Sequence, residues 1–226
     1  MNVSMNDIAY DVIEMYKATY KDTDSLDVRQ VYHWVNVARS FIIKQRLEKN
    51  IFNIYEEEIQ QIKGIVLGAV TGSTGVVGSS SAIPSTIPRT GYQGTITRVS
   101  YPYSGTSLLT FNPYPVQIVT QKRFQRVGNR KFNGSLFYAT IGMDKKLYFK
   151  TYTLTGIDRI MVEGVFQNPI EVMLFNSETD PYNAAYPLNS NLIKDVTNLI
   201  VSEKFQFILQ QTEDKVPEDG RDSTTK

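Results

Sequence analysis

The amino-acid sequence predicts an α+β protein, in which helices from both ends of the chain pack as a small bundle and an antiparallel β domain is inserted between them. Apolar residues recur at helical spacing near the two ends, whereas the middle is rich in Val, Ile, Thr, Tyr and Phe, interrupted by Gly, Pro and Asn. Helices followed by strands and then a helix favour segregated helices and strands over an alternating α/β fold. We therefore expect a helical bundle at residues 1–58 and 188–211 and a β-rich domain at residues 59–187.

Three helices are predicted. Residues 6–19 and 26–49 form an N-terminal pair, and residues 191–211 form an amphipathic C-terminal helix. Residues 212–226 are charged and small, so we expect a disordered tail. The apolar positions that define the helical stripes are Ile8, Val12, Met15, Val28, Val31, Val35, Ala38, Ile42, Ile193, Val196, Ile200 and Phe207. The charge run at residues 56–58 is interpreted as a solvated surface.

The middle of the chain predicts six strands and one long loop. Residues 71–91 consist mainly of Gly, Ser, Thr and Pro, a composition typical of a mobile loop. Prolines then indicate an irregular connection between the last strand and the C-terminal helix. The predicted strands are residues 64–70, 94–101, 115–121, 135–141, 146–153 and 159–166.

Charge is distributed unevenly along the chain. The 24 Lys and Arg and 23 Asp and Glu give a net charge of +1. Residues 59–143 contain eight basic residues and no acidic one, a charge of +8. The two ends together hold the other 16 basic residues and all 23 acidic ones, a charge of −7. A basic middle between acidic ends favours contact with an acidic partner or with nucleic acid.

The densest basic segment is predicted to be a β-hairpin at residues 121–134. Three interpretations remain open: a solvated hairpin, a hairpin that docks on an acidic neighbouring subunit, and a hairpin that faces the phosphates of DNA. The segment offers no recognition helix, so sequence-specific base readout is not expected. The candidate interface or DNA-facing residues are Lys122, Arg123, Arg126, Arg130 and Lys131.

Composition disfavours most catalytic and membrane classes. There is no cysteine, which excludes disulfides, thiolate nucleophiles and Cys-based metal sites. The one histidine, His33, lies inside a predicted helix, where a packed or surface role is usual. No stretch approaches eighteen consecutive apolar residues, and the first twenty residues lack the apolar region of a signal peptide, so neither a membrane span nor secretion is expected.

Two motifs suggest chemistry that their context does not support. The glycines of Gly72-Ser73-Thr74-Gly75-Val76-Val77-Gly78 are spaced as in a dinucleotide-binding loop, but a Ser- and Pro-rich stretch follows where that loop requires a helix. The acidic cluster at residues 22–27 lacks the Gly and the distant Glu of an EF-hand and suits a helix start instead. We predict no catalytic, cofactor-binding or metal-ligating residue.

Several segments, considered together, resemble one viral protein family. They are Val99-Ser100-Tyr101-Pro102-Tyr103-Ser104-Gly105, the stretch Ile160-Met161-Val162-Glu163-Gly164-Val165-Phe166-Gln167-Asn168-Pro169, and Tyr186-Pro187-Leu188 before a final amphipathic helix. With the helical start, this organisation resembles the tail ring proteins of crAss-like podoviruses. It is more distantly similar to the tail-tube gatekeeper proteins of short-tailed phages.

The resemblance implies a structural virion protein without enzymatic activity. It implies a homo-oligomeric ring, commonly of twelve copies, that contacts the portal protein and other tail ring proteins and forms part of the DNA conduit. The expected location is the virion tail, with the host cytoplasm during assembly. In such a ring the loop would order only against another subunit, because its own residues bury too little apolar area to offset ordering entropy. The candidate clamping residues are Gly72, Gly75, Gly78, Pro84 and Pro88.

Two other functions remain as alternatives. The +8 segment at residues 59–143 is compatible with a nucleic-acid-binding protein outside any virion. The spacing from Gly72 to Gly78 is compatible with a nucleotide-binding enzyme. A test for self-assembly separates the ring from both alternatives.

Overall fold

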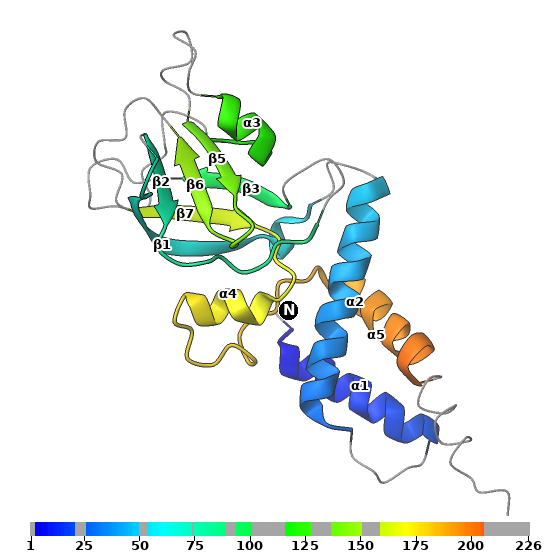
Figure 1. Ribbon diagram of the computed structural model, residues 1–226. Coiled ribbons are helices and arrows are strands. Elements are labelled where there is room, and N and C mark those ends of the chain that lie inside the picture. The colour runs from blue at the N-terminus through cyan, green and yellow to red at the C-terminus, as the bar shows by residue number, and fades with distance from the viewer. Residues whose placement is uncertain are drawn as a thin grey trace, which may run out of the picture.

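A computed structural model describes residues 3–20, 26–49, 54–73, 75–88, 94–100, 116–127, 137–150 and 159–205. The helices are α1 (Met5–Tyr20), α2 (Val28–Lys49), the 3-10 turn η1 (Glu56–Glu58), α3 (Gln121–Arg126), α4 (Pro169–Phe175) and α5 (Ser190–Ile200), which continues as the π-helical turn η2 (Val201–Phe205). The strands are β1 (Gln60–Ala69), β2 (Val76–Ser79), β3 (Ile96–Ser100), β4 (Val116–Ile118), β5 (Phe137–Ile141), β6 (Leu147–Lys150) and β7 (Arg159–Gly164). The sheet and the α1–α2–α5 bundle occupy opposite ends of the molecule, and α2 extends from one toward the other (Figure 1).

The α+β fold class is confirmed, with one difference in the sheet. Among the described residues, seven strands lie in the order β3-β7-β1-β2-β6-β5-β4, and every neighbouring pair is antiparallel except β4–β5, which is parallel. The sheet is therefore mixed and not wholly antiparallel. Strand β1 pairs with β7 through residues 60–66 and with β2 through residues 67–69. The register shifts between Ile62 and Ile65, where Gly64 has a φ of 70° that only glycine adopts without strain.

Two hydrophobic cores and a small bridging cluster hold the fold together. The helical core is built mainly from the apolar faces of α1, α2 and α5, and the sheet core from the alternating inward residues of the strands. Helix α4 contributes to both cores, through Ile170 to the helical core and through Val172 to the sheet core. The bridging cluster consists of Ile43, Leu47, Ile87 and Val165, and it packs the C-terminal half of α2 against the β part of the chain.

Most of the predicted elements are present near their predicted bounds. The two N-terminal helices correspond to α1 and α2, and the six predicted strands correspond to β1 and β3–β7. The C-terminal helix begins at Ser190, where the Asn189 side chain accepts a hydrogen bond from the Asn191 N–H at 2.9 Å. The stretch from residue 206 onward, including the predicted end of this helix and the predicted tail at 212–226, lies outside the described residues.

Helix α4 replaces part of the predicted irregular connection. Pro169 occupies its first turn, where the missing N–H costs nothing because no helical acceptor precedes it. The Asn168 side chain caps the helix by accepting the Ile170 N–H at 3.2 Å. The proline that suggested an interruption is therefore a helix start.

The prediction of a long mobile loop at residues 71–91 is wrong for most of its length. Residues 76–79 form β2, an interior strand between β1 and β6. Beyond it, the Ile83 N–H donates to the Lys145 carbonyl at 2.9 Å and the Ile87 N–H to the Val165 carbonyl at 3.1 Å. Both isoleucine side chains are buried. This segment orders against its own chain because the β1, β6 and β7 regions supply the hydrogen-bond partners and apolar contacts that its own sequence lacks.

The predicted basic hairpin is also corrected, because its first part is a helix. Residues 121–126 form α3, and the Phe124 N–H donates to the Thr120 carbonyl at 2.8 Å. The sequence of α3 is Gln-Lys-Arg-Phe-Gln-Arg, in which five of the six residues are strong helix formers and none is β-branched. Helix propensity over these six residues was the signal, and the turn-like Gly128-Asn129 after them obscured it.

Candidate interaction surfaces

Helix α3 presents the described part of the predicted basic segment. It lies beside β5, and its Lys122, Arg123 and Arg126 side chains are all exposed. Neither of the ion pairs found in the described parts of the chain involves these residues. Arg130 and Lys131 lie outside the described residues. The structure thus brings three of the five predicted cations together on one short helix that faces solvent.

The glycine-rich motif forms a β-hairpin turn. Gly72 and Gly75 have φ angles of 81° and 73°, which the turn between β1 and β2 requires, and both are exposed. Gly78 is buried within β2. The element that follows is therefore a strand and not the helix at which a phosphate-binding loop ends. Of the two prolines predicted in this segment, Pro84 is buried and Pro88 is exposed.

A buried arginine lies where α2 meets the β part of the chain. Arg39 is fully buried, and its guanidinium donates to the Pro187 carbonyl at 2.9 Å and to the Phe166 carbonyl at 2.8 Å. It also lies 5.7 Å from the centre of the Tyr186 ring. Burial lowers the pKa of the Arg39 guanidinium and raises the pKa of the Tyr186 hydroxyl. One side chain of α2 thereby holds two chain segments that lie far from it in sequence.

A second arginine lies near the other end of this contact. Arg46 donates to the carboxylate of Glu58, which is fully buried, and the Arg46 guanidinium lies 4.3 Å from the centre of the Tyr55 ring. Most of the buried polar side-chain atoms without a hydrogen-bond partner among the described residues belong to this region: Arg39 Nη2, Arg46 Nε and Nη1, Glu58 Oε1 and Gln60 Oε1. We call Arg39, Arg46 and Glu58 the buried polar junction.

Sequence reasoning missed this junction. The run at residues 56–58 was interpreted as a solvated surface, and for Glu58 this is wrong. A signal for Arg39 was present, because it lies four residues after Val35 and four before Ile43, on the buried face of α2. A single arginine within an apolar stripe indicates either a local disruption or a buried polar contact, and only the packed structure distinguishes them.

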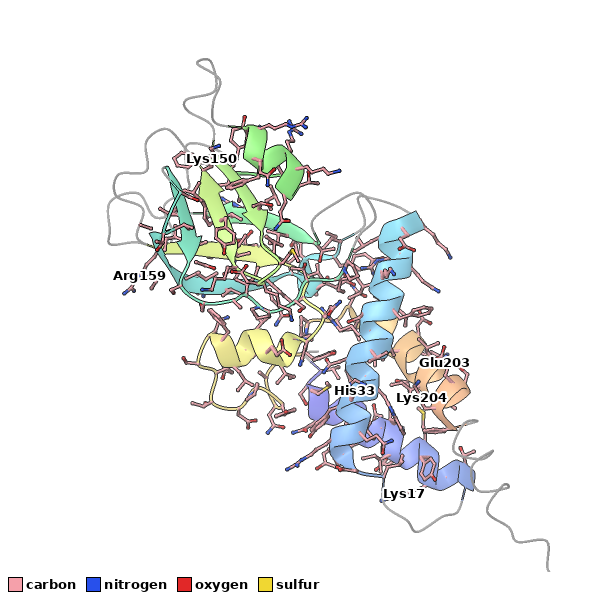
Figure 2. The ribbon with its side chains drawn as sticks, in the orientation of Figure 1. Lys17, His33, Lys150, Arg159, Glu203 and Lys204 are labelled. Carbon is pink, nitrogen blue, oxygen red and sulfur yellow. The ribbon has the colours of Figure 1, made fainter. Side chains whose placement is uncertain are left out.

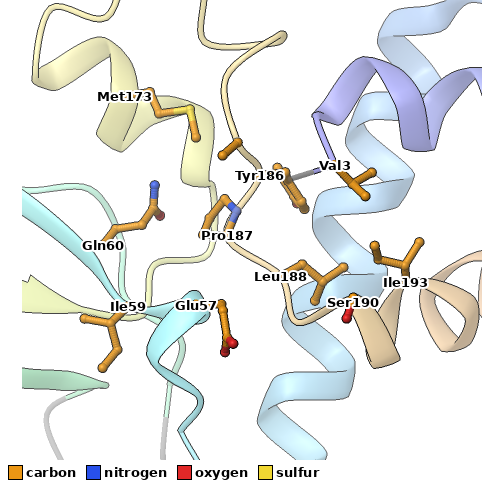
Figure 3. A pocket seen from close by; sticks show the side chains of 11 residues that line it. Val3, Glu57, Ile59, Gln60, Met173, Tyr186, Pro187, Leu188, Ser190 and Ile193 are labelled. Atoms are coloured by element: carbon orange, nitrogen blue, oxygen red, sulfur yellow. The ribbon is translucent and has the colours of Figure 1, made fainter. Parts of the chain in front are cut away.

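A cavity of about 460 Å³ opens between the start of β1, α4 and the beginning of α5 (Figure 3). Most of its lining residues are apolar, with Met173, Leu188 and Ile193 among them, and Glu57 is the one charged side chain among its described lining residues. The Tyr186 hydroxyl donates to the Asn36 side chain at 2.7 Å and is therefore engaged. The lining offers no pair of groups suited to acid–base or nucleophilic chemistry.

The outer face of α1 is acidic and partly aromatic. Asp7, Tyr10, Asp11 and Glu14 recur at helical spacing, and all four are exposed. The Asp7 carboxylate accepts from the Ser4 N–H at 2.9 Å and from its hydroxyl at 2.8 Å, contacts that lower the Asp7 pKa. We call these four residues the acidic α1 face.

Two more tyrosines lie beside this face. Tyr32 and Tyr182 stack with their ring centres 4.7 Å apart, and Tyr32 donates to the Asn6 side chain. Desolvation raises the pKa of Tyr32, with smaller electrostatic contributions from Tyr10, Tyr182 and Asp180. The surface thus combines carboxylates with exposed aromatic rings.

The side chains that commonly bind metal ions do not cluster in the described parts of the chain. His33 is exposed on α2, as Figure 2 shows, and the described ranges hold no group of three or more His, Asp and Glu side chains arranged to bind a metal ion. Among the helices that the structure describes, none is long and apolar enough to cross a membrane.

Comparison with known proteins gives one family. No curated protein matches the chain. The family model described as phage tail ring protein 2 matches residues 7–223, which include nearly every element of the fold. The resemblance to crAss-like tail ring proteins is therefore confirmed. The chain belongs to the phage tail ring protein 2 family of crAss-like phages, and thus to the structural proteins of the virion tail.

Proposed function

We propose that this chain assembles as a homo-oligomeric ring around the DNA conduit at the portal–tail junction, where it joins the portal protein to the other tail ring proteins. The family match over residues 7–223 carries the proposal. The ring is expected to hold twelve copies, to form in the host cytoplasm and to persist in the virion. We infer a structural role, with no catalytic activity and no cofactor.

The described fold suits a rigid ring subunit that contacts a neighbour on each side. The buried polar junction and the bridging cluster tie the helical core to the sheet core, so the two parts form one packed unit. A ring needs two different surfaces on each subunit, one for each neighbour. The exposed cations of α3 and the acidic α1 face are two such surfaces on opposite ends of the molecule (Figure 1).

The subunit-clamping role predicted for residues 71–91 is narrowed by the fold. Residues 76–88 are engaged within their own chain, so we assign any contact with a neighbour to the exposed β1–β2 turn, which carries Gly72 and Gly75. Shortening it should weaken assembly while leaving the isolated fold intact.

Native mass spectrometry and electron microscopy of the full chain test the proposal directly. We expect closed rings of uniform copy number, formed by the chain alone or on its purified portal partner. A chain that remains monomeric in both settings contradicts the ring.

Binding to nucleic acid is the second candidate function, favoured by the exposed Lys122, Arg123 and Arg126 on α3. It predicts salt-sensitive binding of the monomer to duplex DNA in the absence of any ring. Measuring DNA binding by fluorescence anisotropy alongside the mass therefore separates the two functions.

A further inference from the structure

We propose that the exposed cations of α3 dock on the acidic α1 face of a second copy of this chain and so form a head-to-tail contact. This inference rests on the proposed ring and names the surfaces that close it. The acidic α1 face is occupied by α3 of the neighbouring copy. The two surfaces are similar in size and opposite in charge. Each spans about two helical turns, one with three cations and the other with three carboxylates.

The positive charge of α3 is not balanced by acidic residues nearby in the sequence. Residues 59–143 contain no acidic residue, so Lys122, Arg123 and Arg126 meet no carboxylate from their own segment. None of them takes part in an ion pair within the described ranges. Three uncompensated cations on one short exposed helix are electrostatically suited to an acidic partner surface.

The acidic α1 face offers both groups that a guanidinium binds. Its carboxylates supply ion pairs, and Tyr10, with 59 % of its surface exposed, supplies an aromatic ring. Tyr32, which stacks on Tyr182, donates a hydrogen bond to the side chain of Asn6 in α1. Tyrosine is favoured at the centre of protein interfaces because it buries a large apolar face and keeps a polar tip.

The chain uses the same pairing inside its own fold. Arg46 lies over the Tyr55 ring while it donates to Glu58, and Arg39 lies near the Tyr186 ring. An arginine held jointly by a carboxylate and a tyrosine is therefore an arrangement that this chain already forms. The acidic α1 face presents the same two groups, carboxylates and a tyrosine ring, to solvent.

Because α1 and α3 lie at opposite ends of one molecule, a contact between them joins two copies of the chain (Figure 1). A contact between two different surfaces of identical chains is heterologous, and repeated rotation about one axis closes it into a ring. Packing α3 against DNA would leave the acidic α1 face unpaired. Docking α3 on protein satisfies both surfaces at once.

Charge reversal of each surface, separately and together, tests the pairing. The first variant carries Lys122→Glu, Arg123→Glu and Arg126→Glu, and the second carries Asp11→Lys and Glu14→Lys. Asp7 is left unchanged because it caps α1. Each variant should keep the wild-type melting temperature and lower the association constant of the ring by about tenfold or more, because several attractive pairs become repulsive. The combined variant should restore ring formation, since the introduced lysines at residues 11 and 14 then attract the introduced glutamates of α3.

Mixing the two single variants sharpens the test. In an alternating ring each reversed α3 meets a reversed α1 face, and each native α3 meets a native one. Equimolar mixing should therefore produce rings with a one-to-one composition by native mass spectrometry. The matched control carries Lys49→Glu, Lys63→Glu and Lys194→Glu, exposed lysines outside both surfaces, and has the same net charge as the first variant. It should assemble as the wild type does.

Three results overturn the inference and differ from one another. Normal assembly of either single variant shows that the reversed surface is not at the contact. Loss of assembly in both, without rescue on combination or mixing, shows that each surface meets a different partner. Normal rings that lose salt-sensitive binding to duplex DNA show that α3 faces the conduit. If the wild-type chain itself forms no ring, alone or with its portal partner, the proposed function fails instead.

Discussion

The buried polar junction and helix α3 use the same residue type in opposite ways. At the junction, Arg39 and Arg46 are held by carbonyl groups, a carboxylate and tyrosine rings in the interior of the fold. On α3, Arg123 and Arg126 stand in solvent without an ion pair from the described residues. Charge alone does not determine the contribution of an arginine to folding, because that contribution depends on what replaces water around it.

This contrast separates folding from assembly in one chain. A buried arginine that donates to groups distant in sequence orders the segments that carry them, and its loss leaves those groups unpaired in the interior. An exposed arginine contributes little to the monomer, and its interaction energy remains available for a partner. We therefore expect substitutions at the junction to unfold the chain and substitutions on α3 to leave it folded but alter its associations.

Removing Arg39 should have the largest effect on the folded chain. Arg39→Ala leaves the carbonyls of Phe166 and Pro187 without their donor and opens a space the size of a long side chain. The free energy of unfolding should fall by about 3–5 kcal/mol, as for other large deletions in a packed interior. Urea denaturation followed by circular dichroism measures it. A loss below about 1 kcal/mol would mean that the junction relaxes freely. The junction and α3 would then not differ in their contribution to folding.

The second largest loss of stability should come from shortening an apolar side chain where α2 packs against the β part of the chain. Ile87 is fully buried in the bridging cluster with Ile43 and Val165. Ile87→Ala should reduce the free energy of unfolding by about 2–4 kcal/mol through lost burial and a residual cavity. Pro88→Ala, an exposed change at the neighbouring position, is the matched control. Equal melting temperatures for the two variants would show that this segment is a mobile loop, as its composition predicted.

Neutralising Glu58 tests the ionic part of the junction. Glu58→Gln keeps the shape of the side chain but leaves Arg46, which is about 16 % exposed, without its anionic partner. The expected loss is about 2–3 kcal/mol, below that of a fully buried pair because the Arg46 side chain is partly exposed. Glu57→Gln next to it, at an exposed residue, should change little. If both variants unfold at the same urea concentration, the ion pair is not stabilising.

The smallest effect on folding is expected on α3. Replacing Lys122, Arg123 and Arg126 together by Ser should change the free energy of unfolding by no more than about 0.5 kcal/mol per residue, because the side chains are exposed. Assembly should weaken, and the residual association should no longer decrease as salt is added. Analytical ultracentrifugation at two salt concentrations measures both. An unfolded variant would show that α3 stabilises the sheet and is not a docking element.

Local pattern in the sequence was sufficient for most of the architecture. The stripe of Ile8 and Val12 in α1 and the alternation of Leu147 and Phe149 in β6 repeat at the periods that place side chains on one face. Such periods are properties of neighbouring residues, so they are readable without a fold. The family resemblance rested on the same local features together with their order along the chain.

Among the interaction surfaces, the sequence alone predicted the cations of α3 and the excess of acid at the ends. It did not predict the acidic α1 face as a surface, although the spacing of Asp7, Asp11 and Glu14 was available. The tyrosines beside that face come from α2 and from the turn after α4, and their proximity is a consequence of tertiary packing. The hairpin predicted at residues 121–134 failed because a turn signal was given more weight than helix propensity.

Tertiary structure alone decided the features whose partners are distant in sequence. Val76–Ser79 is a strand because β1 and β6 flank it, and nothing in four residues that include a glycine requires this. Arg39 is buried because carbonyls from residues 166 and 187 replace the water around its guanidinium. Periodicity and propensity describe what a segment can form by itself. The burial of a segment and the pairing of its polar groups depend on which other segments pack against it, and only the folded chain brings those segments together.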